Sequence, residues 1–297
     1  RGKRIDLGDV TQTALLAIEG ERDDISGLGQ TRAALDLTPK LSDKKKRPTA
    51  LLDLDVHFGT NALAMDLEPG RGLTDAIDNP SRIDGLFIER AMVRASDTLA
   101  ILSAEAPISQ PMMTDGGAFY QLLEEFRQVF ECSVVDLPRN MLIQHPHLMT
   151  DAQVTLVVTE LTLAAARDTI RILSWLKSNA PQSRVLVVAN RVHPGSPEIS
   201  RKDFETSIER KVDVLIPFDL RVGAQAAKLG KTLAEAAKGS KVGAACTALL
   251  DQVLGAADAG DGATGAAAPR KKGDSLLGKI GDFRNMMPSR RKAKTAA

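Results

Sequence analysis

Carboxylate side chains close two short apolar runs of the sequence. Asp53 and Asp55 end the run TALLDLD, and Asp136 ends the run CSVVD. Carboxylates spaced two residues apart at the end of a strand suit a hydrated Mg²⁺ ion and an attacking water. A carboxylate in such a place also serves as a helix N-cap or a turn former, so each residue taken singly leaves a structural role open.

A polar pair follows a third apolar run. Asn190 and Arg191 come directly after RVLVVA. An amide in this place suits hydrogen bonding to the edge of a purine, and it equally suits a turn. His145 and His147 could bring two imidazoles near each other, but a polar loop after VVDLPRN explains them better than a metal site.

These residues need a scaffold that brings the ends of different strands together. Short apolar, β-branched runs alternate with longer segments of helical period, which is typical of βα units in a largely parallel sheet. Ligands bind at the carboxyl ends of the strands in such sheets. The sequence therefore predicts an α/β fold with a doubly wound, mostly parallel sheet flanked by helices. The predicted strands are 49–53, 99–103, 132–136, 154–159, 184–189 and 212–216, with a further candidate at 14–18, and the predicted helices are 118–130, 161–177, 200–209, 221–228 and 242–253.

Helix 161–177 has the clearest helical period. Apolar residues recur in it at steps of three and four, so we expect them to form the buried stripe of the helix. These residues are Leu163, Ala166, Ile170, Leu173 and Leu176.

Composition excludes several classes of protein. The 297 residues are 43% hydrophobic and 26% charged, which is a globular balance. Aromatic residues make up only 3% of the chain, so the core must be aliphatic and an aromatic platform for nucleic-acid bases is not expected. Cys132 and Cys246 allow one disulfide at most, which does not resemble a secreted scaffold, and a reducing cytoplasm is the default compartment.

The net charge of +1 hides an uneven distribution. Residues 269–297 carry nine basic and two acidic side chains, a net charge of +7, which leaves 30 basic and 36 acidic side chains, or −6, on residues 1–268. The acidic body argues against a DNA-binding face. Residues 255–268 are rich in glycine and alanine and predict a linker, so the folded domain is expected to end near Leu254.

The basic tail contains an amphipathic pattern. Leu276, Leu277, Ile280, Phe283 and Met287 follow helical spacing among basic residues. A short basic amphipathic helix on a flexible tether suits an anionic membrane surface or a groove on a partner protein. The alternative is a disordered basic tail that only aids solubility.

At this point the sequence resembles a known family. The runs LLDLDVHFGTNALAMDLEPGRGLTDAI, VVDLPRN, DAQVTLVVTELTLAAARDTIRIL, VANRV and VDVLIPFDLRVGAQAAKLGKTL follow the order and spacing of the MinD/ParA-type P-loop ATPases, which have a deviant Walker motif. More narrowly, VVDLPR, ARDTIRIL, NR and IPFD before a Gly-Lys pair resemble the CpaE/TadZ branch, which localises Flp/Tad pilus assembly. The resemblance covers residues 49–254.

The resemblance implies roles for the residues above. Asp53 and Asp55 match the switch-I carboxylates, of which the second positions the hydrolytic water, and Asp136 matches the Walker B residue that holds Mg²⁺ through water. At the other end of the site, Asn190 and Arg191 match the residues beside adenine. Pro217 and Phe218 match the loop that closes over the base.

The phosphate loop departs from the family pattern. About 22 residues before Asp53 the chain reads ISGLGQT, in which Gly27, Gly29 and Gln30 match loop positions and Thr31 matches the hydroxyl that holds Mg²⁺. Both lysines of the family motif are missing, since Ile25 and Gln30 stand in their places. A loop without these charges neutralises phosphate poorly, so at most slow ATP hydrolysis is expected.

The sequence therefore predicts an ATP- and Mg²⁺-binding localisation or scaffold protein of the CpaE/TadZ kind. The resemblance implies a nucleotide-linked homodimer, partners in the pilus-assembly and secretion machinery, and a cytoplasmic protein that is peripheral at the inner membrane or a cell pole. The alternatives are a pseudo-ATPase interaction module without nucleotide binding and a ParA-like partition protein. Four regions are predicted: a divergent segment with the degenerate phosphate loop (1–48), the MinD/ParA-like domain (49–254), a linker (255–273) and the amphipathic tail (274–297).

Overall fold

The computed structural model describes most of the chain up to residue 261. The described residues are 13–19, 38–39, 42, 47–109, 111, 116–193, 195 and 198–261, with only the backbone described for 13–19 and 258–261. Two compact units divide the chain, residues 1–260 and 261–297. All predicted positions in 274–297, like the phosphate-loop residues Gly27, Gly29, Gln30 and Thr31, lie outside the described residues.

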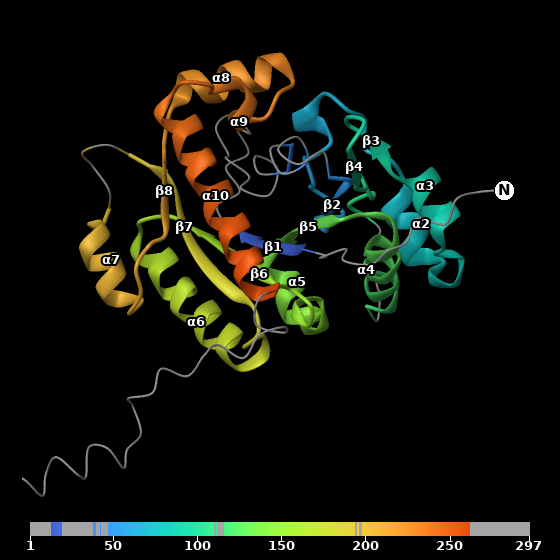
Figure 1. Cartoon of the computed structure of the whole chain (residues 1–297), viewed down its shortest axis with the longest axis horizontal. Helices are drawn as coiled ribbons and strands as arrows, with labels where there is room; N and C mark the ends of the chain where they lie inside the picture. The colour runs from blue at the N-terminus through green and yellow to red at the C-terminus, as the bar shows by residue number, and fades with distance from the viewer. Residues whose placement is uncertain are drawn as a thin grey trace, which may run out of the picture. The chain divides into compact units, whose positions relative to one another are not determined.

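One eight-stranded sheet forms the centre of the first unit, in the order β3-β4-β2-β5-β1-β6-β7-β8 (Figure 1). The strands pair in parallel, except that the short edge strand β3 runs antiparallel to β4. The predicted doubly wound, mostly parallel α/β fold is therefore confirmed. The strands are β1 (Thr13–Glu19), β2 (Thr49–Asp53), β3 (Val93–Arg94), β4 (Leu99–Leu102), β5 (Cys132–Pro138), β6 (Val154–Thr159), β7 (Arg184–Val192) and β8 (Val214–Pro217).

Helices cover both faces of the sheet. Leu51 and Val134 contribute to a core with α8, α9 and α10, whereas the next residues along the same strands, Leu52 and Val135, contribute to a core with α2, α3 and α4. This alternation follows from the two-residue period of a strand. The helices are α2 (Gly72–Asp78), α3 (Gly85–Ala91), α4 (Gly117–Val129), α5 (Arg139–Gln144), α6 (Leu163–Asn179), α7 (Arg201–Ser207), α8 (Leu220–Leu229), α9 (Leu233–Ala236) and α10 (Lys241–Asp261), with 3-10 turns η1 (Leu63–Met65), η2 (Pro80–Arg82) and η3 (Pro146–Met149).

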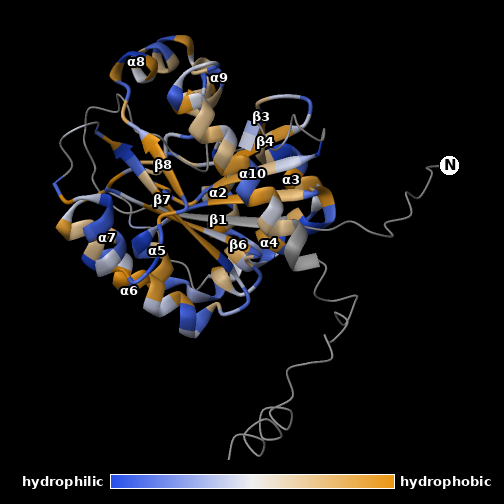
Figure 2. Ribbon diagram, turned by 60° about the vertical axis from the view of Figure 1, so that its left-hand side comes forward, coloured by the Kyte–Doolittle hydropathy of each residue, from blue (hydrophilic) through white to orange (hydrophobic). Residues whose placement is uncertain are grey.

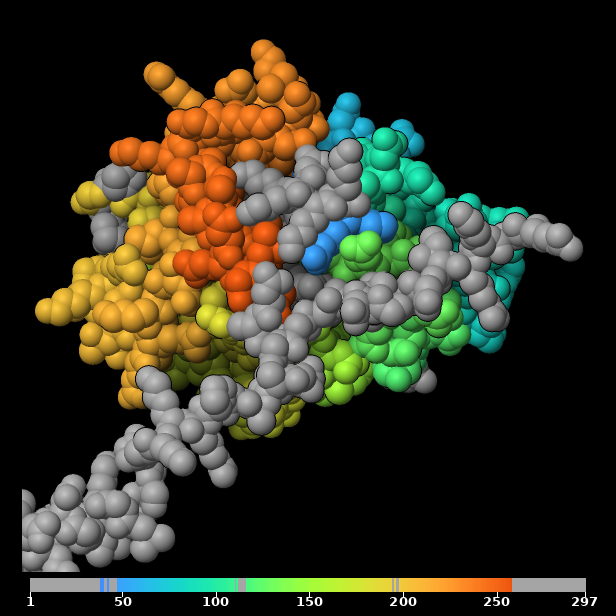
Figure 3. Space-filling model, in the orientation of Figure 1, coloured from blue at the N-terminus to red at the C-terminus, as the bar shows by residue number. Residues whose placement is uncertain are grey.

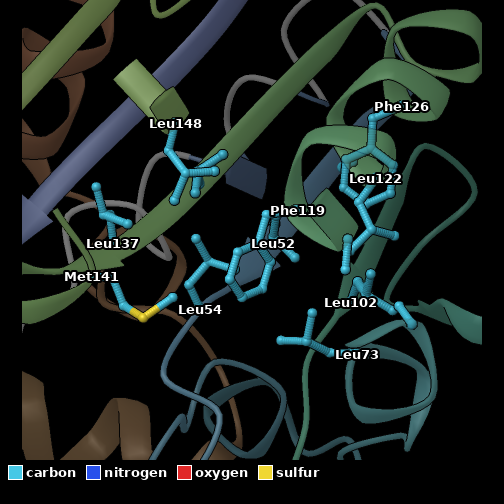
Figure 4. Packing of buried hydrophobic residues seen from close by; sticks show 14 of the residues in the cluster. Leu52, Leu54, Leu73, Leu102, Phe119, Leu122, Phe126, Leu137, Met141 and Leu148 are labelled. Carbon is cyan, nitrogen blue, oxygen red and sulfur yellow. The ribbon is translucent and has the colours of Figure 1, made fainter. Parts of the chain in front are cut away.

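The core is aliphatic, as the composition predicts. Apolar strands lie in the middle of the molecule and hydrophilic helix faces lie outside them (Figure 2). Phenylalanines enter the core mainly from α4, where Phe119 and Phe126 pack with Leu122 against Leu52 (Figure 4). Among the described residues, no helix is long and apolar enough to cross a membrane.

Three details differ from the sequence-based expectations. The candidate strand at 14–18 forms as β1 and lies between β5 and β6, so a strand from the predicted segment 1–48 is central to the sheet. On α6 the buried residues are Ala166, Thr169 and Leu176, whereas Leu163 and Ile170 are exposed because the helix turns a different stripe to the sheet. Helix α10 continues past Leu254 to Asp261.

The extension of α10 has a physical reason. Ala256 and Ala257 are buried in the same core as the rest of the helix. Alanine has the highest helix propensity and loses no side-chain entropy on burial. The backbone of residues 255–261 therefore continues the helix and Ala256 and Ala257 pack in the core, so the expectation of an unpacked linker that starts at residue 255 was wrong.

Candidate functional site

The register of the sheet brings the predicted carboxylates together. Asp53 at the end of β2 is in register with Asp136 on β5, and Asp136 is in register with Ala17 on β1. Residues in register on neighbouring parallel strands point to the same face of the sheet. Two aspartates from positions 83 residues apart in the chain therefore meet at the carboxyl edge of the sheet, where ligands bind in this class of fold.

Asp53 and Asp55 have different environments. The Asp53 carboxylate is fully buried and accepts hydrogen bonds from the backbone N–H groups of Asp55 and Asn61, both at 3.2 Å. Asp55 is half-buried, and its carboxylate accepts a hydrogen bond from the backbone N–H of Phe58 at 3.0 Å. Asp53 is thus a fixed part of the loop, whereas Asp55 lies near the surface, where a substrate can reach it.

Asn61 joins the two buried carboxylates. Its backbone N–H donates to Asp53, and its side-chain Nδ2 donates to Oδ2 of Asp136 at 2.7 Å. The Asn61 side chain is itself fully buried. Sequence reasoning missed this residue, although its place eight residues after Asp53 in the quoted run was a usable signal.

Gly59 allows the loop to close over Asp53. A Cβ atom at Gly59 would lie 2.6 Å from Oδ2 of Asp53 and 2.5 Å from the carbonyl oxygen of Asp55. The backbone N–H of Gly59 also donates to that carbonyl at 2.8 Å. Any side chain at this position would push the loop away from the buried carboxylate, so the turn requires glycine.

Two buried polar atoms beside the carboxylates have no hydrogen-bond partner in the described structure. They are Oδ1 of Asn61 and Oγ of Ser103, the residue that directly follows β4, the strand paired with β2. Buried polar atoms normally find a partner. The oxygen-rich surroundings of Asp53, Asp136 and Asn61 fit a hydrated Mg²⁺ ion.

A metal at this place would also need ligands from outside these side chains. The described ranges contain no cluster of three or more histidine, cysteine, aspartate or glutamate side chains that could hold an ion. Magnesium usually keeps several waters and takes oxygens from bound phosphates. The residues present therefore fit an ion that arrives with a nucleotide better than a permanently bound one.

The second cluster lies at the ends of β7 and β8. Oδ1 of Asn190 accepts the backbone N–H of Arg191 at 2.8 Å, and Arg191 adopts a left-handed conformation with φ of 52°. The Arg191 guanidinium lies 3.5 Å from a carboxylate oxygen of Glu160 and 5.9 Å from the ring centroid of Phe218. A non-glycine residue in this conformation costs of order 1 kcal/mol or more and is enriched at functional sites.

Phe218 presents a flat surface at this end of the edge. It lies one residue beyond Pro217, the last residue of β8, and its N–H donates to the carbonyl oxygen of Val192 at 3.0 Å. The ring of His193 packs beside it with a centroid distance of 4.4 Å. The structure therefore brings together all four residues predicted for the base, at the two strand ends where the sequence placed them.

The other histidine pair lies apart from these clusters. The rings of His145 and His147 are 5.7 Å apart, and Nε2 of His147 lies 3.2 Å from the carbonyl oxygen of Gly116. His145 also packs edge-on against Phe119 of the core. These contacts fix the segment after α5 against the start of α4, which is a structural role.

Known structures share this fold. The chain superposes on a ParA family ATPase from Chlorobium tepidum with a TM-score of 0.68 and 16% identity, covering 83% of this chain and 99% of that one. The cell division ATPase MinD from Pyrococcus furiosus gives a TM-score of 0.62 at 18% identity, covering 82% and 98%. A complex of a Cyanothece McdA variant with ATP gives 0.61 at 15% identity, covering 82% and 96%. The predicted MinD/ParA-type fold is confirmed.

Comparison of the sequence with protein families and curated proteins gives less information than comparison of the structures. Residues 1–61 match the family model described as the C-terminus of PHB de-polymerase, which is about a fifth of the chain. The described part of that segment contains β1 and β2, two inner strands of the sheet. No curated protein matches the chain.

Proposed function

We propose, from the premise of the MinD/ParA-type fold, that this protein binds Mg²⁺ and ATP and acts as a localisation scaffold of the CpaE/TadZ kind. One observation carries the proposal. A buried Asp53–Asn61–Asp136 cluster and the Asn190–Phe218 cluster stand at the same carboxyl edge of one sheet, from β2 and β5 to β7 and β8. Their chemistry matches the two ends of a metal-bound nucleotide.

The carboxylate cluster would hold the metal end. Asn61 donates to one carboxylate oxygen of Asp136, which restricts the orientation of the carboxylate at this edge of the sheet. Asp53 stiffens the loop, and Asp55 is exposed enough to orient a water. When bound, Mg²⁺ would neutralise phosphate charge, and this matters here because Ile25 and Gln30 replace the lysines of the phosphate loop.

The other cluster would hold the base. The Phe218 ring can stack on a purine, and the Asn190 amide lies at the adjoining strand end. Oδ1 of Asn190 accepts the backbone N–H of Arg191, and an amide side chain of this kind has the donor chemistry that a purine acceptor requires. The ATP complex of McdA, which has the same fold, supports ATP as the nucleotide.

Hydrolysis should be slow at most. Phosphoryl transfer depends on positive charge around the transferred group, and the phosphate loop lacks both lysines. Thr31, Gly27 and Gly29 remain available for phosphate and metal. The rival within this fold is a pseudo-ATPase that keeps the sheet for interactions alone.

The proposed scaffold role includes partner proteins and a location in the cell. We propose a homodimer linked by nucleotide that recruits pilus-assembly and secretion proteins at the cytoplasmic face of the inner membrane or a cell pole. The tail 274–297 would contact anionic lipid through its basic and apolar residues. Flotation on vesicles with phosphatidylglycerol should fall when residues 269–297 are deleted, and unchanged flotation would exclude the membrane role.

Equilibrium binding of labelled ATP tests the central proposal. Wild type should bind at millimolar nucleotide or below, and removal of Mg²⁺ by EDTA should weaken binding. Asp136→Ala should reduce the affinity about tenfold or more. Asp84→Ala is the matched control, because Asp84 also accepts a backbone hydrogen bond but caps α3 outside the site. No binding by wild type would eliminate the nucleotide function in favour of the pseudo-ATPase, whereas equal affinities would refute the role of Asp136.

DNA binding of the partition type is a second candidate, and one observation favours it. Five exposed basic residues lie on α8, α9 and the start of α10, although residues 1–268 are acidic overall. The two acidic residues among them, Asp219 and Glu235, cap helix N-termini. The basic residues are Arg221, Lys228, Lys231, Lys238 and Lys241.

Duplex DNA of random sequence tests this candidate. If these residues contact phosphates, binding should weaken steeply with salt, and Lys228→Glu with Lys231→Glu should weaken it further. The matched control is Lys177→Glu with Lys202→Glu, two exposed lysines on α6 and α7. Equal effects of both pairs, or no binding at low salt, would exclude a specific role for the α8–α10 surface.

A further inference from the structure

The loop that carries the carboxylate cluster ends against helix α8. Asp66 closes the η1 turn in a left-handed conformation with φ of 58°, and Gly230 ends α8 with φ of 56°. A Cβ atom at Gly230 would lie 2.5 Å from Cβ and 3.2 Å from Cγ of Asp66. The far end of the carboxylate loop is therefore seated directly on the C-terminal turn of α8.

Glycine is required at position 230 for two separate reasons. A left-handed residue at a helix C-terminus favours glycine in any surroundings. Here the space is also occupied, because the nearest atoms belong to the rigid base of the Asp66 side chain and its Cα at 3.5 Å. Gly239, which follows α9, has φ of 82° but no atom within 4 Å of an added Cβ. Among the described glycines, only Gly230 combines both constraints with a contact to the loop.

The segment between Asn61 and Asp66 is short and partly packed, with Leu63 and Asp66 exposed. The N–H of Leu67 donates to the carbonyl oxygen of Ala62 at 3.0 Å, which closes the turn. Ala64, Met65 and Leu67 pack against the core that α8, α9 and α10 share with the sheet. In Figure 3 the blue surface of the segment after β2 lies beside the orange surface of α8 and α9. A shift at Asp66 can therefore pass to Asn61 through a short segment that is anchored in the core.

Helix α8 also begins at the base end of the site. Its N-cap Asp219 directly follows Phe218, and the Asp219 carboxylate accepts the N–H groups of Arg221 and Val222 at 3.1 Å. One ten-residue helix thus starts beside the aromatic surface for the base and ends against the loop of the carboxylates.

We infer that Gly230 is a positioning residue of the nucleotide site. Because position 230 has no side chain, Asp66 packs against the C-terminal turn of α8. This Asp66–Gly230 contact, called the seat below, holds Asn61 and Asp53 where they orient Asp136 for the metal. The inference rests on the proposed nucleotide function for its effect on binding. The seat itself is a property of the loop and can be measured without nucleotide.

Alanine variants separate the seat from ordinary backbone strain. Gly230→Ala should lower the affinity for ATP with Mg²⁺ about tenfold, since small displacements of positioned groups have large effects. Gly239→Ala bears the same left-handed strain without the clash, so its affinity should stay within about twofold of wild type. Binding measured in EDTA should change much less in Gly230→Ala, because the loop acts on the metal end. Equal affinities for the two variants would overturn the inference.

A second substitution should restore the ATP affinity that Gly230→Ala loses. Asp66→Gly removes the atoms that an alanine at position 230 would meet and keeps the left-handed conformation without strain. The double variant Gly230→Ala with Asp66→Gly should recover ATP affinity to within about threefold of wild type. A double variant as weak as Gly230→Ala alone would show that the clash with Asp66 is not the cause.

Hydrogen exchange keeps the inference testable if nucleotide does not bind. Peptides that cover residues 54–67 should exchange faster in Gly230→Ala than in wild type or Gly239→Ala, and the double variant should restore protection. Unchanged exchange in this loop would refute the seat. Faster exchange in a protein that binds no ATP would support the seat and refute the proposed function alone.

Discussion

The two ends of the site are built in different ways. At the carboxylate end, Asp53, Asn61 and Asp136 are buried and hold one another through direct hydrogen bonds. At the other end, Arg191 and Phe218 are partly exposed and meet through a cation–π contact. The comparison distinguishes a buried, directly hydrogen-bonded cluster, which under the proposed function is the metal end, from a partly exposed cluster, which under the proposed function is the base end.

Substitutions in the buried carboxylate cluster should lower the free energy of unfolding the most. Asp53→Ala removes an acceptor from one buried and one partly buried backbone N–H group, so the free energy of unfolding should fall by about 2 to 4 kcal/mol. Asp55→Ala frees one exposed N–H group and should cost less than about 1 kcal/mol. Urea unfolding of both variants measures the difference. Equal losses would contradict the distinction between a buried and a surface carboxylate.

Substitutions at the base end should change the affinity for ATP and not the free energy of unfolding. Phe218→Ala removes a stacking surface worth about 0.5 to 1.5 kcal/mol, so ATP affinity should fall about twofold to twelvefold. The loss should be the same with and without Mg²⁺, because the ring lies at the base end. Phe218→Trp is the control that keeps an aromatic face. A loss of ATP affinity that appears only with Mg²⁺ would contradict the proposed place of Phe218 beside the base.

Acid should loosen the segment before β8, at the opposite end of that strand from Phe218, through Glu205. Hydrogen bonds from Lys211 and Arg201, with a further one from the N–H of Val212, lower the pKa of Glu205 to about 2 from an ordinary value of 4.5. Because the folded-state pKa is depressed, the contribution to stability is full above pH 4.5 and is lost as the pH falls toward 2. Glu205→Gln should flatten urea stability across this window. An unchanged pH slope would exclude the network before β8 as an acid-sensitive point.

The two cysteine thiols should be unreactive in the folded protein. Burial raises the pKa of Cys132, at the start of β5, to about 12, and Cys246 is buried on α10. Thiolate is the reactive form. Neither thiol should react with Ellman's reagent at pH 8 until the protein is unfolded. Rapid reaction of the native protein would mean that the core beneath the carboxylate end opens easily.

Much of the fold could be predicted because its signals are local. The runs TALLD and VTLVVT predicted strands with the observed bounds, since β-branched and aliphatic residues between turn residues leave few alternatives. Short helices such as α2, α5 and α9 were missed because fewer than eight residues give no clear period. The stripe of α6 was misplaced because packing against the sheet and α7, not the period alone, chose which residues are buried.

The sequence by itself determined the chemistry at each strand end: aspartates after β2 and β5, a polar pair on β7 and an aromatic residue after β8. Only the tertiary structure decided that Asn61 links Asp53 to Asp136 and that Gly230 seats Asp66. The reason is physical. Residue type and period act over a few neighbouring residues, whereas these contacts join residues 75 and 164 positions apart, and only the register of the sheet and the packing of α8 bring them within contact.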